Sequence, residues 1–227
     1  DGGRTLVSSF CPAAIGKVEL EWRSLQNLAV VRQLTLDGDV EWSRIVVRAL
    51  RAEVGLFALG QSDGKVRVWS TRTGSEVATF MLPDCLSDKP VLATPIRGLA
   101  ISPDGQLVAA GIAGNSQIGI FSVAENKMLY SRHTRPLFTV MKGDRLGDPG
   151  ELVFLGFSPD NKLLATTDAT EPDIRLWEAR TGREAGLLSG HRDHAVAVAF
   201  SPDVKTLAST GGDGSLKLWH LPTRREV

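Results

Sequence analysis

Serine, histidine and aspartate lie close together between Gly190 and Trp219, and they are the residue types of a hydrolase triad. In such a triad His191 would be the base, Ser209 the nucleophile and Asp213 the group that orients the base. A nucleophile must lie exposed beside an oxyanion hole, and no Gly-x-Ser-x-Gly elbow surrounds Ser209. The sequence therefore predicts no catalytic residue here.

Two other groups could carry chemistry. His191, Asp193 and His194 are close enough in sequence to suggest a metal site, but the chain has only four histidines, and zinc requires three or four convergent ligands. The glycines of Gly60–Lys65 resemble a phosphate loop, but Val66 occupies the position of the magnesium-binding hydroxyl. We predict no metal, no cofactor and a simple hairpin turn at Gly60–Lys65.

These residues belong to a unit that recurs along the chain, and its closing aromatics are 47, 52, 56 and 42 residues apart. A period of roughly 40–45 residues is typical of propeller arrays, and the longer spacings indicate insertions. In the last copy, Ala195–Phe200 is a short apolar run typical of a buried strand, and Ser201–Asp203 is a turn sequence. Gly211–Gly214 is a hairpin sequence, and an alternating strand follows it. The copies align on an aromatic residue that closes this strand, namely Trp22, Trp69, Phe121, Trp177 and Trp219.

The pattern predicts an all-β chain, a β-propeller of four-stranded antiparallel blades with about five blades represented. These residues resemble the WD-repeat (WD40) family along essentially the whole chain. Gly190-His191, the Ser-Pro-Asp turn and Trp219 occupy the family's positions, while His220 replaces the aspartate that follows the tryptophan. The expected blades are residues 1–34, which is partial, 43–80, 95–131, 151–188 and 190–227, which is also incomplete.

The resemblance assigns a structural role to the residues that suggested a triad. In WD repeats the equivalents of His191, Ser209, Asp213 and Trp219 form a buried hydrogen-bonded network. The resemblance also implies a non-enzymatic protein–protein interaction scaffold, or a docking or sensor module. Its partner would be another protein or another domain of the same polypeptide. The clean Ser-Pro-Asp turns and the missing aspartate after Trp219 suggest a bacterial origin.

Five copies are fewer than the seven typical of the family, and three explanations are open. The chain is a segment of a longer protein, which we favour, or it closes as an unusually small ring, or two chains complete each other. An open half-ring alone is the least credible state, because an unpaired strand edge promotes aggregation.

Two insertions between copies, at Leu82–Thr94 and Thr134–Gly150, are candidate binding loops on a rigid scaffold. A solvated or self-packed loop is an equal alternative. The second loop combines basic residues with an apolar centre, a composition common at partner contacts. Together with the hairpin residues expected on the same side, the candidate partner-binding face comprises Asp63, Arg132, His133, Arg135, Phe138, Lys142, Arg145, Asp193 and His194.

Composition limits the remaining classes. The formal net charge is zero, and no apolar run approaches the length of a membrane span, so nucleic acid and membrane partners are not expected. Two cysteines, Cys11 and Cys85, are too few for a disulfide framework, which favours a reducing, cytoplasmic setting and leaves one bridge open. The alternative function is a propeller enzyme or small-ligand binder that uses the central channel. It is disfavoured because the expected inner strands are almost entirely apolar.

Overall fold

The computed structural model describes residues 5–10, 18–36, 45–82, 95–112, 117–133, 152–169 and 171–227. All regular elements in these ranges are β-strands, so they include no helix that could span a membrane. The strands form one three-stranded and four four-stranded antiparallel sheets. The predicted all-β fold with four-stranded blades is confirmed.

Each sheet is formed by strands that follow one another in the sequence. The first contains β1 (Thr5–Phe10), β2 (Glu19–Ser24) and β3 (Val30–Thr35). The second contains β4 (Ile45–Arg51), β5 (Leu56–Gln61), β6 (Lys65–Ser70) and β7 (Glu76–Met81). The third contains β8 (Ile96–Ile101), β9 (Leu107–Ile112), β10 (Gln117–Ser122) and β11 (Lys127–His133). The fourth contains β12 (Leu152–Phe157), β13 (Leu163–Asp168), β14 (Glu171–Glu178) and β15 (Glu184–Leu188). The fifth contains β16 (Ala195–Phe200), β17 (Thr206–Gly211), β18 (Leu216–His220) and β19 (Arg225–Glu226).

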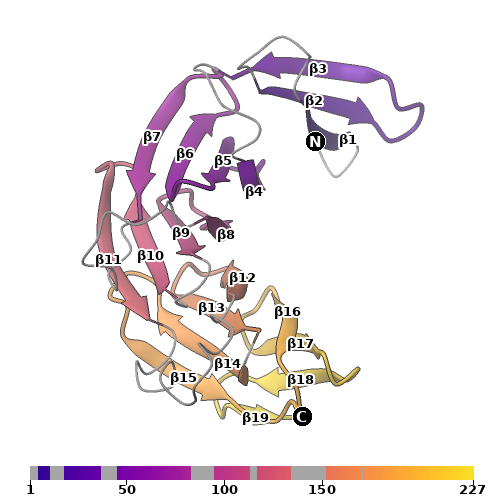
Figure 1. Ribbon diagram of the computed structural model, residues 1–227. Coiled ribbons are helices and arrows are strands. Elements are labelled where there is room, and N and C mark those ends of the chain that lie inside the picture. Colours follow the sequence, from indigo (N-terminus) through magenta and orange to yellow (C-terminus); the bar gives the residue numbers. More distant parts are fainter. Residues whose placement is uncertain are drawn as a thin grey trace.

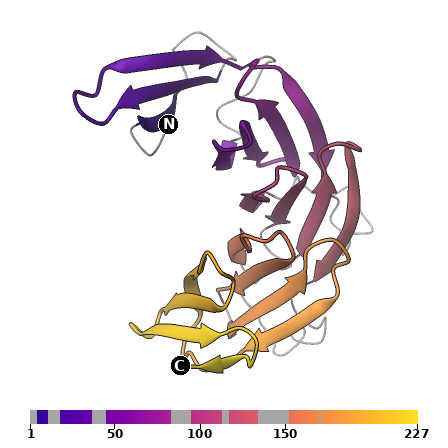
Figure 2. The same ribbon diagram turned by 180° about the vertical axis from the view of Figure 1, so that it is seen from behind.

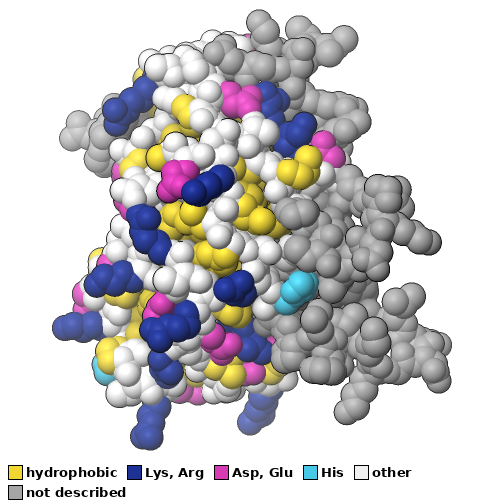
Figure 3. All heavy atoms as spheres, turned by 90° about the vertical axis from the view of Figure 1, so that its left-hand side faces the viewer, with side chains coloured by type: hydrophobic (Ala, Val, Ile, Leu, Met, Phe, Trp, Pro, Cys, Tyr) yellow, Lys and Arg dark blue, Asp and Glu magenta, His cyan; other side chains and the backbone are white. Residues whose placement is uncertain are grey.

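The five sheets stand side by side in an open arc, with β1–β3 at one end and β16–β19 at the other (Figures 1 and 2). The strands β4, β8, β12 and β16 line its concave side, and neighbours among them are in contact. Viewed from the side of the outer strands, apolar side chains gather midway along the arc between charged ones (Figure 3). Val77, Met81 and Met128 are exposed on β7 and β11.

The core consists of layers between neighbouring sheets. Side chains alternate between the two faces of a strand, so each inner sheet contributes to two layers. Val66 and Val68 of β6 are fully buried against the third sheet, where Phe80 stacks on Phe121 with ring centroids 4.6 Å apart. In every layer a Trp or Phe from one sheet lies against aliphatic residues from its neighbour.

The Ser-Pro-Asp turns join the first and second strands of the last three sheets. In the third sheet Ser102 Oγ donates to Asp104 Oδ1 (2.6 Å) and accepts from the Leu107 amide (2.9 Å). The same bonds recur in the turns that begin at Ser158 and Ser201. These turns lie at one end of the strands, which we name the turn end. The β5–β6 and β17–β18 hairpins lie at the opposite end of the strands, which we name the hairpin end.

The first copy departs from the predicted alignment by one residue. In β6 and β14 a bulge directly precedes the closing aromatic, Trp69 or Trp177, and in β2 the bulge lies between Trp22 and Arg23. Arg23, not Trp22, therefore occupies the closing position. A shift of one residue moves a side chain to the other face of a sheet. Trp22 accordingly packs toward the second sheet, in the layer that contains Phe57.

Candidate functional site

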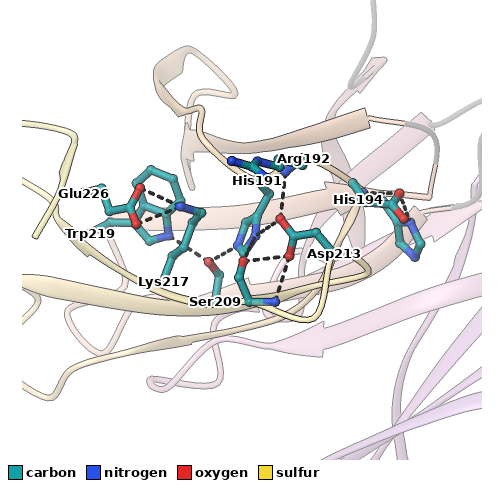
Figure 4. Close-up of polar contacts among 10 residues, drawn as sticks. His191, Arg192, His194, Ser209, Asp213, Lys217, Trp219 and Glu226 are labelled. Atoms are coloured by element: carbon teal, nitrogen blue, oxygen red, sulfur yellow. Dashed lines mark hydrogen bonds and ion pairs between the residues drawn. The ribbon is translucent and has the colours of Figure 1, made fainter.

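Ser209 is the centre of the polar cluster that sequence analysis singled out (Figure 4). Its Oγ lies 2.7 Å from His191 Nε2 and accepts a hydrogen bond from Trp219 Nε1 at 2.8 Å. Ser209 comes from the centre of β17, Trp219 from β18, and His191 from the segment that precedes β16. The imidazole therefore joins that segment to the two middle strands of the last sheet.

The other side of the imidazole faces the β17–β18 hairpin. His191 Nδ1 lies 3.0 Å from Ser215 Oγ and 3.4 Å from Asp213 Oδ2. Asp213 accepts from the Arg192 amide (2.8 Å) and from both the amide and the hydroxyl of Ser215 (2.9 and 2.6 Å). These bonds, above all the one from the Ser215 hydroxyl, hold the pKa of Asp213 well below its usual range.

One arrangement of protons satisfies this whole set. The Ser215 hydroxyl donates to Asp213, so its oxygen accepts from His191 Nδ1–H. A neutral imidazole with its proton on Nδ1 leaves Nε2 free to accept from the hydroxyl of Ser209. Ser209 then uses its oxygen to accept from Trp219.

This geometry is unsuited to nucleophilic catalysis. The Ser209 residue is 2% exposed and the His191 side chain is fully buried. Trp219 covers the serine oxygen, which a substrate carbonyl would have to approach. The arrangement can hold a loop on a hairpin, and it cannot present a serine to a substrate.

The possible metal ligands do not converge. Among the residues that the structure describes, no three His, Cys, Asp or Glu side chains form a group able to hold a metal ion. His194 Nδ1 pairs with Asp193 Oδ1 at 2.8 Å, and this contact lowers the pKa of Asp193. His191, the third candidate, is turned into the network around Ser209.

One Gly-x-Ser-x-Gly sequence does occur in the chain, at Gly60–Gly64. It forms the hairpin between β5 and β6, where Gly64 has a φ of 79° and its amide donates to the Gln61 carbonyl. A nucleophile elbow requires a strand followed directly by a helix, and a strand follows here. The predicted hairpin is therefore what this glycine-rich stretch forms.

The candidate partner-binding face is only partly described. Asp63 lies in the β5–β6 hairpin, Arg132 and His133 end β11, and the pair Asp193–His194 precedes β16, all at the hairpin end of their sheets. Arg132 is exposed, with its guanidinium carbon 5.6 Å from the ring centroid of Tyr130. The other four residues lie outside the described ranges: Arg135, Phe138, Lys142 and Arg145.

Sequence reasoning missed Ser215 and the Arg192 amide as members of the network. Both contact Asp213, one from within the hairpin and one from the loop beside it. An aspartate two residues before a serine in a tight hairpin is a local signal for the first contact. Nothing local signals the second, which joins residues 21 positions apart.

The turn end holds a hollow of about 360 Å³ at the ends of the inner strands. Arg51, Glu53, Phe157 and Phe200 contribute to its wall together with two turn prolines, Pro103 and Pro159. A second hollow of about 600 Å³ lies between the third and fourth sheets. Among the charged residues that line it, Lys162 pairs with Asp160, and Glu178 pairs with Arg183 outside the hollow.

Comparison with known proteins agrees with the fold. The profile of the family described as "WD domain, G-beta repeat" matches residues 182–220, which include His191, Ser209, Asp213 and Trp219. Matching sheets and this network define a repeat protein of the propeller type. The chain is thus similar to WD40-repeat proteins, and its residues 182–220 match the repeat itself.

Three relatives illustrate the similarity. The chain is 27% identical over 171 residues to Periodic tryptophan protein 2 homolog of Dictyostelium discoideum, covering 75% of this chain and 16% of the relative. It is 32% identical over 125 residues to the uncharacterized WD repeat-containing protein sll1491 of Synechocystis, covering 55% and 31%. It is 25% identical over 240 residues to WD repeat-containing protein 1 of Xenopus tropicalis, covering 90% and 37%. The chain thus spans between about a sixth and somewhat over a third of these relatives.

Proposed function

We propose that the protein is a non-enzymatic interaction scaffold or docking module that acts within a larger protein or complex, in the cytoplasm. The observation that carries this proposal is the state of Ser209, His191 and Asp213. They are the residues best suited to catalysis, and their polar atoms are occupied in joining a loop to a hairpin. Repeat domains of this family commonly mediate protein interactions, which supports the same conclusion.

The hairpin end of the arc is the proposed docking face. Asp193 is exposed and held beside His194 by two contacts, one to the His194 amide (2.7 Å) and one to its ring. The network behind them keeps this loop in place, since the Gly212 amide also donates to the His194 carbonyl at 2.8 Å. Exposed charged groups on a loop fixed by buried bonds are pre-organised for a partner, which lowers the entropy lost on binding.

Capture from a lysate tests the proposal, with mass spectrometry to identify what is retained. Asp193→Lys combined with Arg132→Glu should abolish retention of the partner, because both changes reverse exposed charges at the hairpin end. The matched control is Lys205→Glu, a charge reversal at the turn end. Equal retention of the partner by the unaltered protein, the double variant and the control would reject the hairpin end as the docking face.

The hollow at the turn end supports a second candidate, a small-ligand site near the arc's inner strands. Phe157 and Phe200 offer apolar surface, and Arg51 and Glu53 offer charges of both signs. A thermal-shift screen against small molecules tests it. Binding that Phe200→Ala removes and Asp193→Lys does not would assign the site to the hollow.

A further inference from the structure

Thr167 has a buried hydroxyl without a hydrogen-bond partner. The residue is 2% exposed, and its Oγ1 is one of two buried side-chain atoms in the described ranges that lack a partner. The other is Nε2 of His133, the last residue of β11, which borders residues outside those ranges. Thr167 lies within β13, next to Thr166, whose hydroxyl accepts a bond from Trp177. Buried polar atoms are almost always hydrogen-bonded, so this exception marks a place for a ligand.

Thr167 lines a small hollow at the hairpin end of the fourth sheet, where β13 turns into β14. This hollow is smaller than the one at the turn end and the one between the third and fourth sheets. The charged residues in its wall are Asp168, Glu171, Asp173 and Arg175. Because three carboxylates stand against one guanidinium, the wall has an excess of negative charge and attracts a cation.

Two of these acidic residues are directly opposite each other across the hairpin. Strand register pairs Asp168 of β13 with Glu171 of β14. Arg175 Nη2 lies 3.2 Å from Glu171 Oε2, and Arg175 Nη1 lies 3.7 Å from Glu184 Oε1 on β15. The single positive charge of Arg175 is thus divided between two glutamates. Like charges directly opposite in a sheet destabilise it, so an added cation would stabilise this hairpin.

In the fifth sheet the chain itself fills the equivalent position. Gly211 corresponds to Asp168, because each is the second residue after the hydroxyl that holds the indole, Ser209 or Thr166. A Cβ at Gly211 would lie 2.5 Å from His191 Nδ1, so the imidazole occupies that space. The fourth sheet has an aspartate there instead. Its hairpin is therefore not a second copy of the network around Ser209.

The hollow fits an organic cation better than a metal ion. In the described part of the chain, no three carboxylates form a group that could hold a metal. A lysine ammonium has three N–H donors, which one hydroxyl oxygen and two carboxylates can satisfy. The ammonium is also compact, whereas the guanidinium of arginine is a broad planar fork. The small size of the hollow therefore favours lysine.

We propose that this hollow is the pocket for a lysine side chain of the protein that docks on the hairpin end. Thr167 Oγ1 accepts one N–H of the ammonium, and Asp168 and Asp173 supply the negative charge. This inference rests on the proposed docking function and adds the chemistry of the partner, which is a segment with an accessible lysine. Burying a charge is costly unless it is paired and bonded, so the pocket selects a cation that can use all its donors.

Methyl NMR of the protein at its natural length tests the pocket without any partner. The probe is Nα-acetyl-lysine methylamide, and the reporter is the δ1 methyl group of Ile174, which follows Asp173 in β14 and is fully buried. The probe should shift this resonance in a saturable way. The δ1 methyl group of Ile101, at the turn end of β8, is the control and should not shift. The same compound acetylated on its side-chain nitrogen should have no effect, because it is uncharged.

Substitutions separate binding from folding. Thr167→Val keeps the side chain's shape and should weaken binding of the lysine probe about fivefold. It should not lower the melting temperature, because the hydroxyl has no bond to lose, whereas Thr166→Val should lower it. Asp173→Asn should also weaken binding about fivefold. The matched control is Glu125→Gln, which removes an exposed carboxylate in the β10–β11 turn and should leave binding unchanged.

Several outcomes would overturn the proposal. A shift of Ile174 that the acetylated compound reproduces, or that persists in both Thr167→Val and Asp173→Asn, would show that the pocket does not recognise the ammonium. Tighter binding of Nα-acetyl-arginine methylamide would overturn the assignment to lysine. No shift would reject the pocket, while the docking function would still be decided by capture from the lysate. If lysine binds but Thr167→Val retains the captured partner fully, the partner's lysine does not enter this pocket.

Discussion

The fourth and fifth sheets both hold a buried tryptophan by a hydrogen bond from its indole, but the fifth sheet has more hydrogen bonds around that tryptophan. In both, an indole on the third strand donates to a hydroxyl on the second, Trp177 to Thr166 at 2.9 Å and Trp219 to Ser209 at 2.8 Å. Of these two hydroxyls, only that of Ser209 in the fifth sheet is also hydrogen-bonded to a histidine, His191. The indole–hydroxyl bond therefore places the tryptophan, and the histidine adds the connection to the loop and hairpin.

This comparison separates placement of the indole from attachment of the hairpin. The fourth sheet keeps its tryptophan buried, at 5% exposure, although its copy has no Gly-His sequence. In the fifth sheet Asp213 also accepts three hydrogen bonds. Two come from Ser215 in the hairpin, and one comes from the Arg192 amide in the loop before β16. Substitutions in the two sheets test this separation.

Removing the shared hydroxyl should cost more in the fifth sheet than in the fourth. Ser209→Ala leaves both His191 Nε2 and Trp219 Nε1 buried without a partner, a loss of about 2–5 kcal/mol in the free energy of unfolding. Thr166→Val keeps the side chain's shape and leaves only Trp177 Nε1 without a partner. It should lower the free energy of unfolding by about 1–3 kcal/mol. Urea unfolding measures both values, and a larger loss for Thr166→Val would contradict the comparison.

Removing the histidine should weaken only the fifth sheet. We expect His191→Ala to lower the free energy of unfolding by about 1–3 kcal/mol, because Ser209 and Ser215 each lose a buried partner. His194→Ala is the matched control, since its ring is partly exposed and bonds only to the adjacent Asp193. A loss below about 0.5 kcal/mol for His191→Ala would refute the assigned role.

Acid should loosen the β17–β18 hairpin through protonation of Asp213. The pKa of Asp213 is lower in the folded chain than in the unfolded one, so its contribution to stability is present above the unfolded value of about 3.9. That contribution is lost as the pH falls through the lower, folded pKa. Amide exchange at Arg192 and Ser215 should therefore speed up with acid, and Asp213→Asn should remove this dependence.

Making the fourth sheet more like the fifth should have the smallest effect. Thr166→Ser keeps the bond to Trp177 and removes one buried methyl group, which is worth about 0.8 kcal/mol. If Thr166→Ser loses more stability than Thr166→Val, packing of the methyl group contributes more than the hydroxyl bond to holding the indole. Thermal unfolding of the two variants side by side gives the answer.

Much of the fold could be predicted because its signals are local. Ser158-Pro159-Asp160 and its equivalents specify their turns through bonds between residues two to five positions apart. Gly214, with a φ of 75°, fits a tight hairpin that other residues enter at a cost. The network around Ser209 was expected from family resemblance, and the residues involved lie in the positions expected.

The first copy and the partner face could not be predicted in the same way. Trp22 has the residue type of a closing aromatic, but the bulge before Arg23 decides which side of the sheet each side chain faces. A bulge depends on the partner strand and has no marker within β2 itself. The proposed partner face gathers residues from three sheets, and four of its nine members lie outside the described residues.

The sequence by itself determined the strands, the turns and the repeat that links them, because alternation, proline and glycine act over a few residues. Tertiary structure decided how each strand faces its neighbours, because that depends on register between segments that pair only after folding. This register buries Ser209 and turns Trp22 toward the second sheet, whereas Leu216 and Leu218 are exposed because their sheet is the last of the arc.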